Sequence, residues 1–194
     1  SCDWSRSRFT MDSDLSKAVI KVFVSLYNDK LIYKDKKLVN WDTNLQTAIS
    51  DLEVIQKEVQ SQLYYIDYQI LDSDKKITIA TTRPETMMGD TAVVVNPKDQ
   101  RYTDFIGKSV KIPIVNRSIK IIADHYADPE QGSGAVKITP AHDFNDYEVG
   151  KRNKLEIINI FEKNGKINNN GIQELIGLDR FEARKLLVKK LKEY

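Results

Sequence analysis

The sequence predicts an α+β fold in which many short strands form a β-barrel-like core and a few helices flank it. Short runs rich in β-branched and aromatic residues follow one another from residue 63 to residue 161, separated by Gly, Pro and Asn turns. Helical periodicity is confined to the two ends of the chain and one short segment between them. With 194 residues, 41% of them hydrophobic, the chain can bury a core without disulfides.

The first predicted element is an amphipathic helix near the N-terminus with one buried face. Asp12 or Ser13 can cap it. Its apolar residues recur at the i, i+3, i+4 spacing, and they are Leu15, Ala18, Val19, Val22, Phe23, Leu26 and Tyr27. Residues 31–41 then look extended, and residues 42–54 are polar and irregular, as in a connector. We therefore place a domain boundary near residue 56.

A half-buried strand is predicted from Leu63, where the pattern switches to period two. One face carries Tyr64, Ile66, Tyr68 and Ile70, and the other carries Tyr65, Asp67 and Gln69. Further β-rich runs occupy residues 77–82, 91–95, 110–115, 119–122, 135–139 and 157–161. Residues 143–152 predict a short helix, and Asp179 with Glu182 forms a capping-box-like start for a closing helix. We expect a flanking helix and connector at 1–56, a core domain at 57–178 and the closing helix at 179–194.

The composition excludes several classes of protein. A net charge of +2 is too small for a protein that grips a long stretch of duplex backbone, so any nucleic-acid contact should be local. The single cysteine, Cys2, provides neither a disulfide framework nor a Cys-based zinc site, which favours a cytoplasmic protein. No stretch approaches the roughly 20 apolar residues of a membrane span, so we expect no membrane contact. Because the chain opens without Met or a signal segment, we expect it to be a piece of a longer protein.

Residues 81–86, Thr-Thr-Arg-Pro-Glu-Thr, form the first polar motif, directly after an apolar strand. Strand ends that lead into Thr and Pro turns expose backbone donors and hydroxyls, which suits the binding of an ester or a sugar. Thr81, Thr82 and Arg83 are therefore candidate site residues. A plain Thr-rich turn with a surface Arg–Glu pair is the alternative interpretation.

The second polar motif spans residues 132–146. Its glycines permit the backbone to approach a ligand closely. The strand directs Lys137 and Thr139 to one face, and Pro140 ends it before the helix starts. This arrangement makes Lys137 a candidate for contact with a ligand.

Three ionisable residues follow that strand: His142, Asp143 and Asp146. The two aspartates lie three residues apart on one helix face, and N-terminal capping is their alternative role, above all for Asp143. The three side chains could instead bind a divalent metal. We expect no metal, because the only other histidine, His125, lies in a different turn. Ser133 lacks the strand–elbow–helix setting of a Ser nucleophile.

Both motifs closely resemble the editing insertion of the valyl-tRNA synthetases, which are class I aminoacyl-tRNA synthetases. The segments that carry the resemblance are residues 81–93 and 132–150, with flanking matches at 2–6, 9–12, 38–42 and 177–184. Isoleucine and leucine enzymes carry related insertions, but Lys137 stands where the isoleucine family typically has His. The isoleucine enzymes also tend to carry cysteines after the Trp that corresponds to Trp41, and this sequence has none there. Gln131 departs from the aromatic residue of some valine enzymes, which puts any stacking by that residue in doubt.

The resemblance implies post-transfer editing, the hydrolysis of the ester of mischarged Thr-tRNA(Val) by a positioned water. Asp146 would hold the substrate α-ammonium, and Thr82 would act beside it at the reacting ester. The substrate-binding residues that it implies are Thr81, Arg83, Lys137, Asp143 and His142. Of these, we choose Lys137 and Asp143 as the candidates that recognise the threonine hydroxyl. Neither a metal nor a covalent intermediate is required.

The implied partners are the acceptor end of tRNA(Val) carrying threonine and the rest of the parent synthetase. We expect no cofactor for editing, because ATP serves the synthetic domain and its nucleotide-binding signatures are missing from this sequence. Three alternatives stay open: the editing domain of an isoleucyl enzyme, a module that binds the tRNA end without catalysis, and a structural insertion whose editing has decayed. The last two predict no ester turnover.

Overall fold

The computed structural model describes residues 2–194, which divide into two compact units, one ending at Lys37 and one spanning Leu38–Tyr194. The first unit contains the 3-10 helix η1 (Trp4–Arg6) and the helix α1 (Ser13–Asn28). The predicted helix is confirmed, but the prediction of a buried face is wrong, because no residue of α1 is buried. Val19 and Phe23 are 64% and 55% exposed. A unit this short has too little other chain to cover an apolar helix face.

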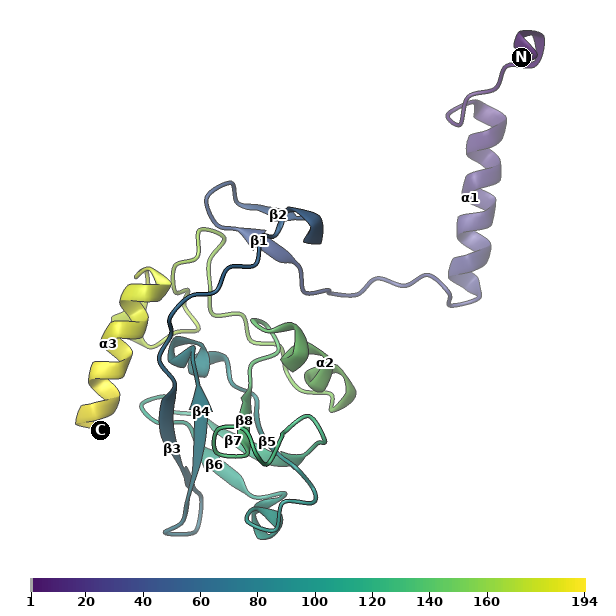
Figure 1. Ribbon diagram of the computed structural model, residues 1–194. Helices are drawn as coiled ribbons and strands as arrows, with labels where there is room; N and C mark the ends of the chain where they lie inside the picture. The colour runs from purple at the N-terminus through teal and green to yellow at the C-terminus, as the bar shows by residue number, and fades with distance from the viewer. Residues whose placement is uncertain (1) are drawn as a thin grey trace. The chain divides into compact units, whose positions relative to one another are not determined.

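The second unit is built on a six-stranded sheet. Its strands are β3 (Tyr64–Ile70), β4 (Lys76–Thr81), β5 (Ala92–Val95), β6 (Ser109–Lys111), β7 (Ser118–Ala123) and β8 (Ala135–Ile138). They lie in the order β4-β3-β6-β7-β5-β8, and every pair is antiparallel except β5 with β7. The outermost strands β4 and β8 contact each other, so the sheet curls into a nearly closed barrel, as Figure 1 shows. The predicted α+β fold with a barrel-like core is confirmed.

The hydrophobic core fills the inside of this curled sheet. The alternation predicted for β3 is confirmed, since Ile66, Tyr68 and Ile70 are buried whereas Tyr65 and Asp67 are exposed. All of β5 is buried, because alternate residues contribute to two clusters: one inside the barrel and one beneath a helix. A strand covered on both faces reads as a continuous apolar run instead of an alternating one.

Helices and short turns surround the barrel. They are η3 (Pro84–Gly89), α2 (Phe144–Arg152), η4 (Thr103–Phe105), η5 (Gln173–Leu175) and α3 (Arg180–Glu193). The two predicted helices of this unit are confirmed, and Asp143 and Asp179 are their N-caps. Helix α2 covers strands β5 and β8 through Val149, which packs with Val94 and Ile138. No helix within residues 2–194 is long and apolar enough to cross a membrane.

Two strand predictions and the prediction of an irregular connector differ from the structure. The run 110–115 ends early as β6, because Pro113 has no N–H to donate and Ile114 adopts a positive φ of 63°. The run 157–161 forms no named strand, and its contribution is a single bridge between Phe161 and Ile167. Residues 42–54 are more regular than predicted, since β1 (Asn40–Asp42) pairs with β2 (Thr47–Ile49) and η2 (Asp51–Glu53) follows.

The hairpin of β1 and β2 is part of the second unit and contacts the segment after α2. Trp41 Nε1 donates a hydrogen bond to the carbonyl oxygen of Lys163 at 2.8 Å. Residues 38–56 thus lie in the same compact unit as the barrel. The functional boundaries at residues 56 and 178 stay a prediction.

Candidate functional site

The two polar motifs meet at one place because each lies at an outermost strand of the curled sheet. Residues 81–86 follow β4 and residues 139–146 follow β8, and these two strands contact each other. A cavity of about 260 Å³ lies between the motifs. All the residues predicted for the site line it: Thr81, Thr82, Arg83, Lys137, His142, Asp143 and Asp146. Its other lining residues are Leu63, Ala80, Thr86, Tyr126, Val136 and Thr139.

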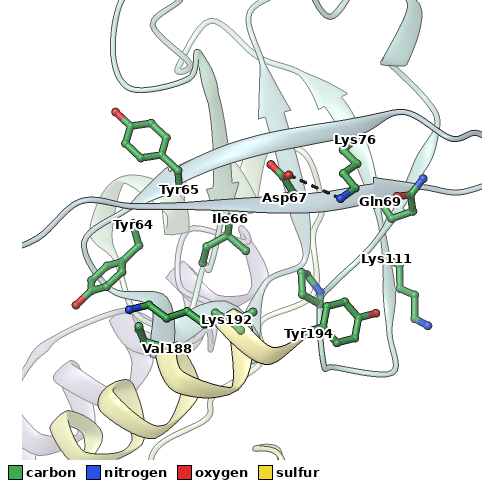
Figure 2. A pocket seen from close by; sticks show the side chains of 12 residues that line it. Tyr64, Tyr65, Ile66, Asp67, Gln69, Lys76, Lys111, Val188, Lys192 and Tyr194 are labelled. Carbon is green, nitrogen blue, oxygen red and sulfur yellow. Dashed lines mark ion pairs between the residues drawn. The ribbon is translucent and has the colours of Figure 1, made fainter.

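A larger groove of about 630 Å³ runs between β3 and the end of α3 (Figure 2). The ion pair drawn there joins Lys76 Nζ and Asp67 Oδ2 at 3.9 Å, and both side chains are more than half exposed. None of the polar residues that line this groove is buried. Such exposed charges are well solvated and bind a ligand weakly, so we place the candidate site at the smaller cavity.

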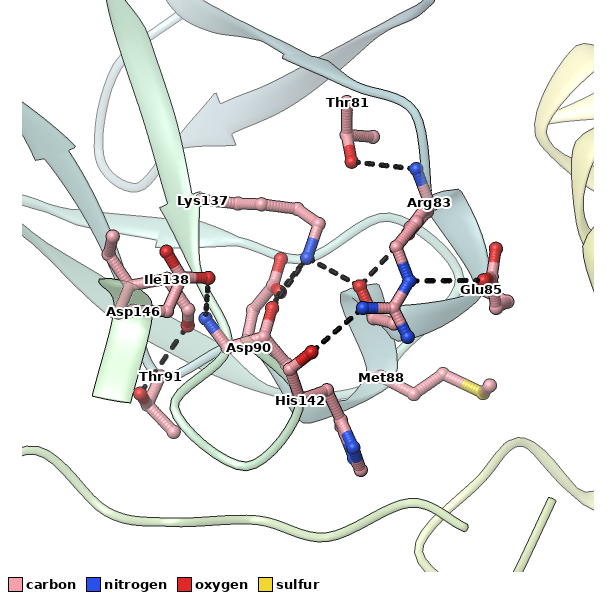
Figure 3. Close-up of polar contacts among 12 residues, drawn as sticks. Thr81, Arg83, Glu85, Met88, Asp90, Thr91, Lys137, Ile138, His142 and Asp146 are labelled. Atoms are coloured by element: carbon pink, nitrogen blue, oxygen red, sulfur yellow. Dashed lines mark hydrogen bonds and ion pairs between the residues drawn. The ribbon is translucent and has the colours of Figure 1, made fainter. Parts of the chain in front are cut away.

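The floor of the cavity is a buried polar network centred on Lys137, which is 6% exposed (Figure 3). Its Nζ donates to Thr86 Oγ1 at 2.7 Å, to Asp90 Oδ1 at 2.9 Å and to Thr139 Oγ1. A buried ammonium is costly unless it is paired and hydrogen-bonded. Asp90, which is fully buried, provides the opposite charge.

Asp90 binds two further side chains. Thr139 Oγ1 donates to its Oδ1 at 2.7 Å, and the Tyr68 hydroxyl donates to its Oδ2 at 2.7 Å. Burial raises the pKa of Asp90, against the opposing effect of Lys137. Burial and the neighbouring carboxylate raise the pKa of Tyr68 well above its usual value, so the phenol keeps its proton.

Sequence reasoning did not select Asp90, Thr86 or Thr139 as site residues. The available signal was the carboxylate of Asp90, two positions before the apolar run 92–95, an unusual place for a charge. The alternation of Lys137 and Thr139 on one strand face was a second signal. Neither reveals that the three segments converge.

The two aspartates of α2 play different roles. Asp143 Oδ1 accepts from the backbone N–H groups of Asn145 at 2.8 Å and Asp146 at 3.1 Å, so the capping interpretation of Asp143 is correct. Asp146 is 7% exposed, and its Oδ2 accepts from Thr139 N at 2.8 Å. Burial raises the pKa of Asp146 to about 6, although the Thr139 N–H and the Lys137 charge oppose this. Asp146 therefore combines a buried carboxylate with a position on the cavity wall.

Arg83 spans the two motifs. One of its guanidinium nitrogens donates to the carbonyl oxygen of His142 at 2.7 Å, and its Nε lies 3.8 Å from Glu85 Oε1. Thr81 Oγ1 accepts from the backbone N–H of Arg83 at 3.1 Å. The surface Arg–Glu interpretation is half right, since Arg83 is partly exposed whereas Glu85 is fully buried. Thr82 is exposed at the mouth of the cavity.

The His142 ring supports the loop below the cavity. Its Nε2 accepts from the backbone N–H of Ile160 at 3.0 Å, and its ring lies edge-on to Phe161 with centroids 4.7 Å apart. Burial lowers the pKa of His142 to about 3, so the ring is neutral at pH 7. Since this nitrogen is already occupied, His142 contributes its carbonyl oxygen, which binds Arg83.

The described residues contain no cluster of side chains that would support the metal interpretation. Within residues 2–194, no group of three or more His, Cys, Asp and Glu side chains is placed to hold a metal ion. Asp143 and His142 are engaged in the contacts described above. Metal independence stays a prediction.

The glycines of the second motif approach protein atoms closely. Gly132 has a φ of +57°, and a Cβ built on it would lie 2.8 Å from the Ala80 Cβ of β4. Gly134 has a φ of +79°, and its Cβ would lie 2.4 Å from the Arg101 guanidinium. A side chain at Gly132 would push against β4, and the positive φ at both positions disfavours any residue with a Cβ, which explains these glycines without a ligand.

The chain was compared with known proteins. Residues 1–183 match the family of tRNA synthetases class I (I, L, M and V). The chain is 69% identical to a valine–tRNA ligase of Pelagibacter ubique (strain HTCC1062), covering 100% of this chain and 22% of that protein. A valine–tRNA ligase of Zymomonas mobilis is 58% identical, with 98% and 22% covered. The chain thus spans about a fifth of the length of these relatives.

One solved structure shares the fold. The agnB2 LeuRS of Agrobacterium radiobacter K84, crystallised in a ternary complex with tRNA and LeuAMS, superposes with a TM-score of 0.56. The match covers 95% of this chain and 32% of that one, at 19% sequence identity. Together with the sequence match, this shows that the chain belongs to the class I tRNA synthetases of the isoleucine, leucine, methionine and valine group.

Proposed function

We propose that this chain is the editing part of a valine–tRNA ligase and that it hydrolyses the ester of mischarged Thr-tRNA(Val). The observation that carries the proposal is the cavity in which the two motifs meet. Lys137 Nζ donates a hydrogen bond directly to Thr86 Oγ1, although the two residues are 51 positions apart in the sequence. The relatives named valine–tRNA ligase, with 54% to 69% identity, support valine over isoleucine.

Editing is needed because threonine and valine are nearly isosteric. An apolar synthetic pocket rejects the added hydroxyl only about a hundredfold, a value known for the valine enzyme itself and not worked out from this structure. A polar cavity can discriminate further, because its buried groups stay unpaired when valine enters. The floor formed by Thr86, Lys137 and Thr139 has this polar character.

Asp146 is the proposed anchor for the substrate α-ammonium. A buried carboxylate of raised pKa gains a partner when the cation enters, and a charge-assisted hydrogen bond also fixes the orientation of the ester. Thr82, Thr81 and Arg83 would surround the ester carbonyl and the terminal adenosine from the opposite wall. A water held between the two walls attacks the ester, with no cofactor.

Lys137 and Asp143 remain the proposed residues for recognition of the threonine hydroxyl. Both line the cavity, one at its buried floor and one at its exposed rim. His142 has a supporting role, because its ring nitrogen binds backbone and its carbonyl holds Arg83.

The proposed partners are the acceptor end of tRNA(Val) carrying threonine and the rest of the synthetase, in the cytoplasm. The net charge of +2 supports a local contact with nucleic acid. The exposed apolar face of α1 supports a contact with the remaining four-fifths of a protein of the relatives' length.

A deacylation assay with purified Thr-tRNA(Val) and Val-tRNA(Val) tests the proposal. It is run with the chain described here and with the longer protein to which it belongs, and a binding assay with uncharged tRNA(Val) accompanies it. We expect threonine to be released faster than valine. Equal release would contradict the proposal, and tRNA binding without release of either amino acid would identify a binding module.

A further inference from the structure

We propose that Arg184 of α3 is a positioning residue for the hydrolysis: it neutralises the buried carboxylate of Glu85, so that Arg83 keeps its place on the cavity wall. The inference rests on the proposed editing function, in which Arg83 contacts the substrate. Arg184 does not line the cavity, whereas Arg83 does, so Arg184 acts through its neighbours.

The first observation is the position of Glu85, which lies in η3 and is fully buried. A buried carboxylate is costly unless it is paired and hydrogen-bonded. Arg184 Nε donates to Glu85 Oε2 and Arg184 Nη2 donates to Glu85 Oε1, both at 2.7 Å. The two residues are 99 positions apart in the sequence. Both oxygens of the buried carboxylate are therefore bound from the closing helix.

The second observation is that Arg83 lies between two acceptors, the His142 carbonyl oxygen and Glu85 (Figure 3). Its Nη1 donates to the carbonyl oxygen of His142 at 2.7 Å, whereas its Nε lies 3.8 Å from Glu85 Oε1. The second distance is too long for a hydrogen bond. Arg83 thus binds the second motif, while Arg184 binds the carboxylate in its place.

The third step is the effect of removing the Arg184 charge. Among the described residues, Arg83 is the other cation that is paired with Glu85. A movement of about 1 Å would bring its guanidinium within hydrogen-bond distance of the unpaired carboxylate. That movement stretches the hydrogen bond to His142 and displaces Arg83 on the cavity wall. A misplacement of about 1 Å at a reacting site can slow a reaction by roughly a hundredfold.

The test measures single-turnover deacylation of Thr-tRNA(Val) by the complete synthetase to which the chain belongs. Arg184→Met removes the charge and keeps an unbranched side chain, and circular dichroism gives the folded fraction. We expect the rate per folded molecule to fall roughly tenfold to a hundredfold. Lys190→Gln is the matched control, since it removes another ion pair of α3, with Glu174 at 3.2 Å, and should leave the rate unchanged.

Two further variants separate positioning from a purely structural role. Glu85→Gln combined with Arg184→Met removes both charges of the pair, so Arg83 has no free carboxylate to bind and the rate should return close to that of wild type. In an Arg83→Ala background, Arg184→Met should slow the reaction no further, because the residue through which it acts is missing. A pair that only stabilises the fold would lower the melting temperature and leave the rate per folded molecule unchanged.

A folded Arg184→Met variant with the wild-type rate overturns the inference. The inference is also overturned if the double variant stays slow, or if Arg184→Met still slows the reaction when Arg83 is Ala. If Arg184→Met does not fold, Arg184→Lys decides, because an ammonium cannot bind both carboxylate oxygens as the guanidinium does. We then expect a smaller slowing, which Glu85→Gln removes, and an unchanged rate overturns the inference.

Failure of the editing function gives a different result. Wild-type protein that releases threonine and valine equally would contradict the editing function itself, whatever the Arg184 variants do. The two failures are therefore distinguishable.

Discussion

Replacing Asp146 by Asn separates the function of this carboxylate from its structural role. Asp146 is 7% exposed, and its Oδ2 accepts the backbone N–H of Thr139 at 2.8 Å. An amide oxygen can accept the same hydrogen bond, but it carries no charge. The variant thus keeps the local geometry and removes the proposed partner of the substrate ammonium.

The stability of the variant follows from the pKa of Asp146, which burial raises from 3.8 to about 6. A carboxyl whose pKa is raised on folding destabilises the folded protein as pH increases from about 4 to about 6, because the unfolded chain loses its proton first. A shift of about two units corresponds to about 3 kcal/mol at neutral pH. Asp146→Asn escapes this cost, so it should unfold at a higher temperature than wild type at pH 7.5, with the difference vanishing near pH 4.

The activity of the same variant should change in the opposite direction. Loss of a charge-assisted hydrogen bond of about 1.5 to 3 kcal/mol slows deacylation of Thr-tRNA(Val) by roughly tenfold to a hundredfold. The assay combines thermal melts at pH 7.5 and pH 4.5 with a single-turnover deacylation rate. Asp143→Asn is the control for the melts, because Asn is as good an N-cap as Asp at this exposed position.

Two outcomes refute this reasoning about Asp146. A normal deacylation rate per folded molecule would remove the carboxylate from the site. A melting temperature below that of wild type at pH 7.5 would show that the ionised side chain stabilises the fold, contrary to the effect expected from its burial.

The remaining predictions concern the independence of deacylation from metal ions, the ion pair made by helix α3 and the His142 ring. Chelators should leave deacylation unchanged, and loss of activity that zinc restores would revive the metal interpretation of His142, Asp143 and Asp146. Arg184 binds Glu85 through two hydrogen bonds of 2.7 Å, so Arg184→Ala leaves a buried carboxylate and should cost about 3 kcal/mol in urea unfolding, with a smaller loss for Arg184→Lys. Because burial lowers the pKa of His142 to about 3, its contribution to stability is complete above about pH 6.5 and is lost as pH falls toward 3. Between pH 7 and pH 5, wild type should therefore lose more stability than His142→Gln, and equal losses would count against a buried neutral ring.

The sequence predicted the elements whose periodicity is local. The alternation in β3 and the caps at Asp143 and Asp179 needed no knowledge of distant residues. The prediction of a strand at residues 157–161 was wrong because the backbone N–H of Ile160 donates to the His142 ring instead of to a neighbouring strand. The prediction of a buried face on α1 was wrong because periodicity shows that a helix face is apolar but does not show what covers it.

The site was predicted only in part, because local sequence patterns do not show which distant residues come together. The seven residues selected from the motifs all line the cavity, but Thr86 and Thr139, which lie in the same motifs and also line it, were not selected. Asp90 was missed because its contacts depend on Tyr68, which lies on β3, and on Lys137 and Thr139, which lie at the end of β8. Its neighbours in the sequence, Gly89 and Thr91, look like an ordinary turn.

The most direct test of the central claim is the ratio of single-turnover rates at which the complete synthetase releases threonine and valine from tRNA(Val). A cavity that selects a hydroxyl donor predicts that threonine is released at least about tenfold faster, since one hydrogen bond at a buried position differs between the two esters. Equal rates for the two esters would contradict the claim.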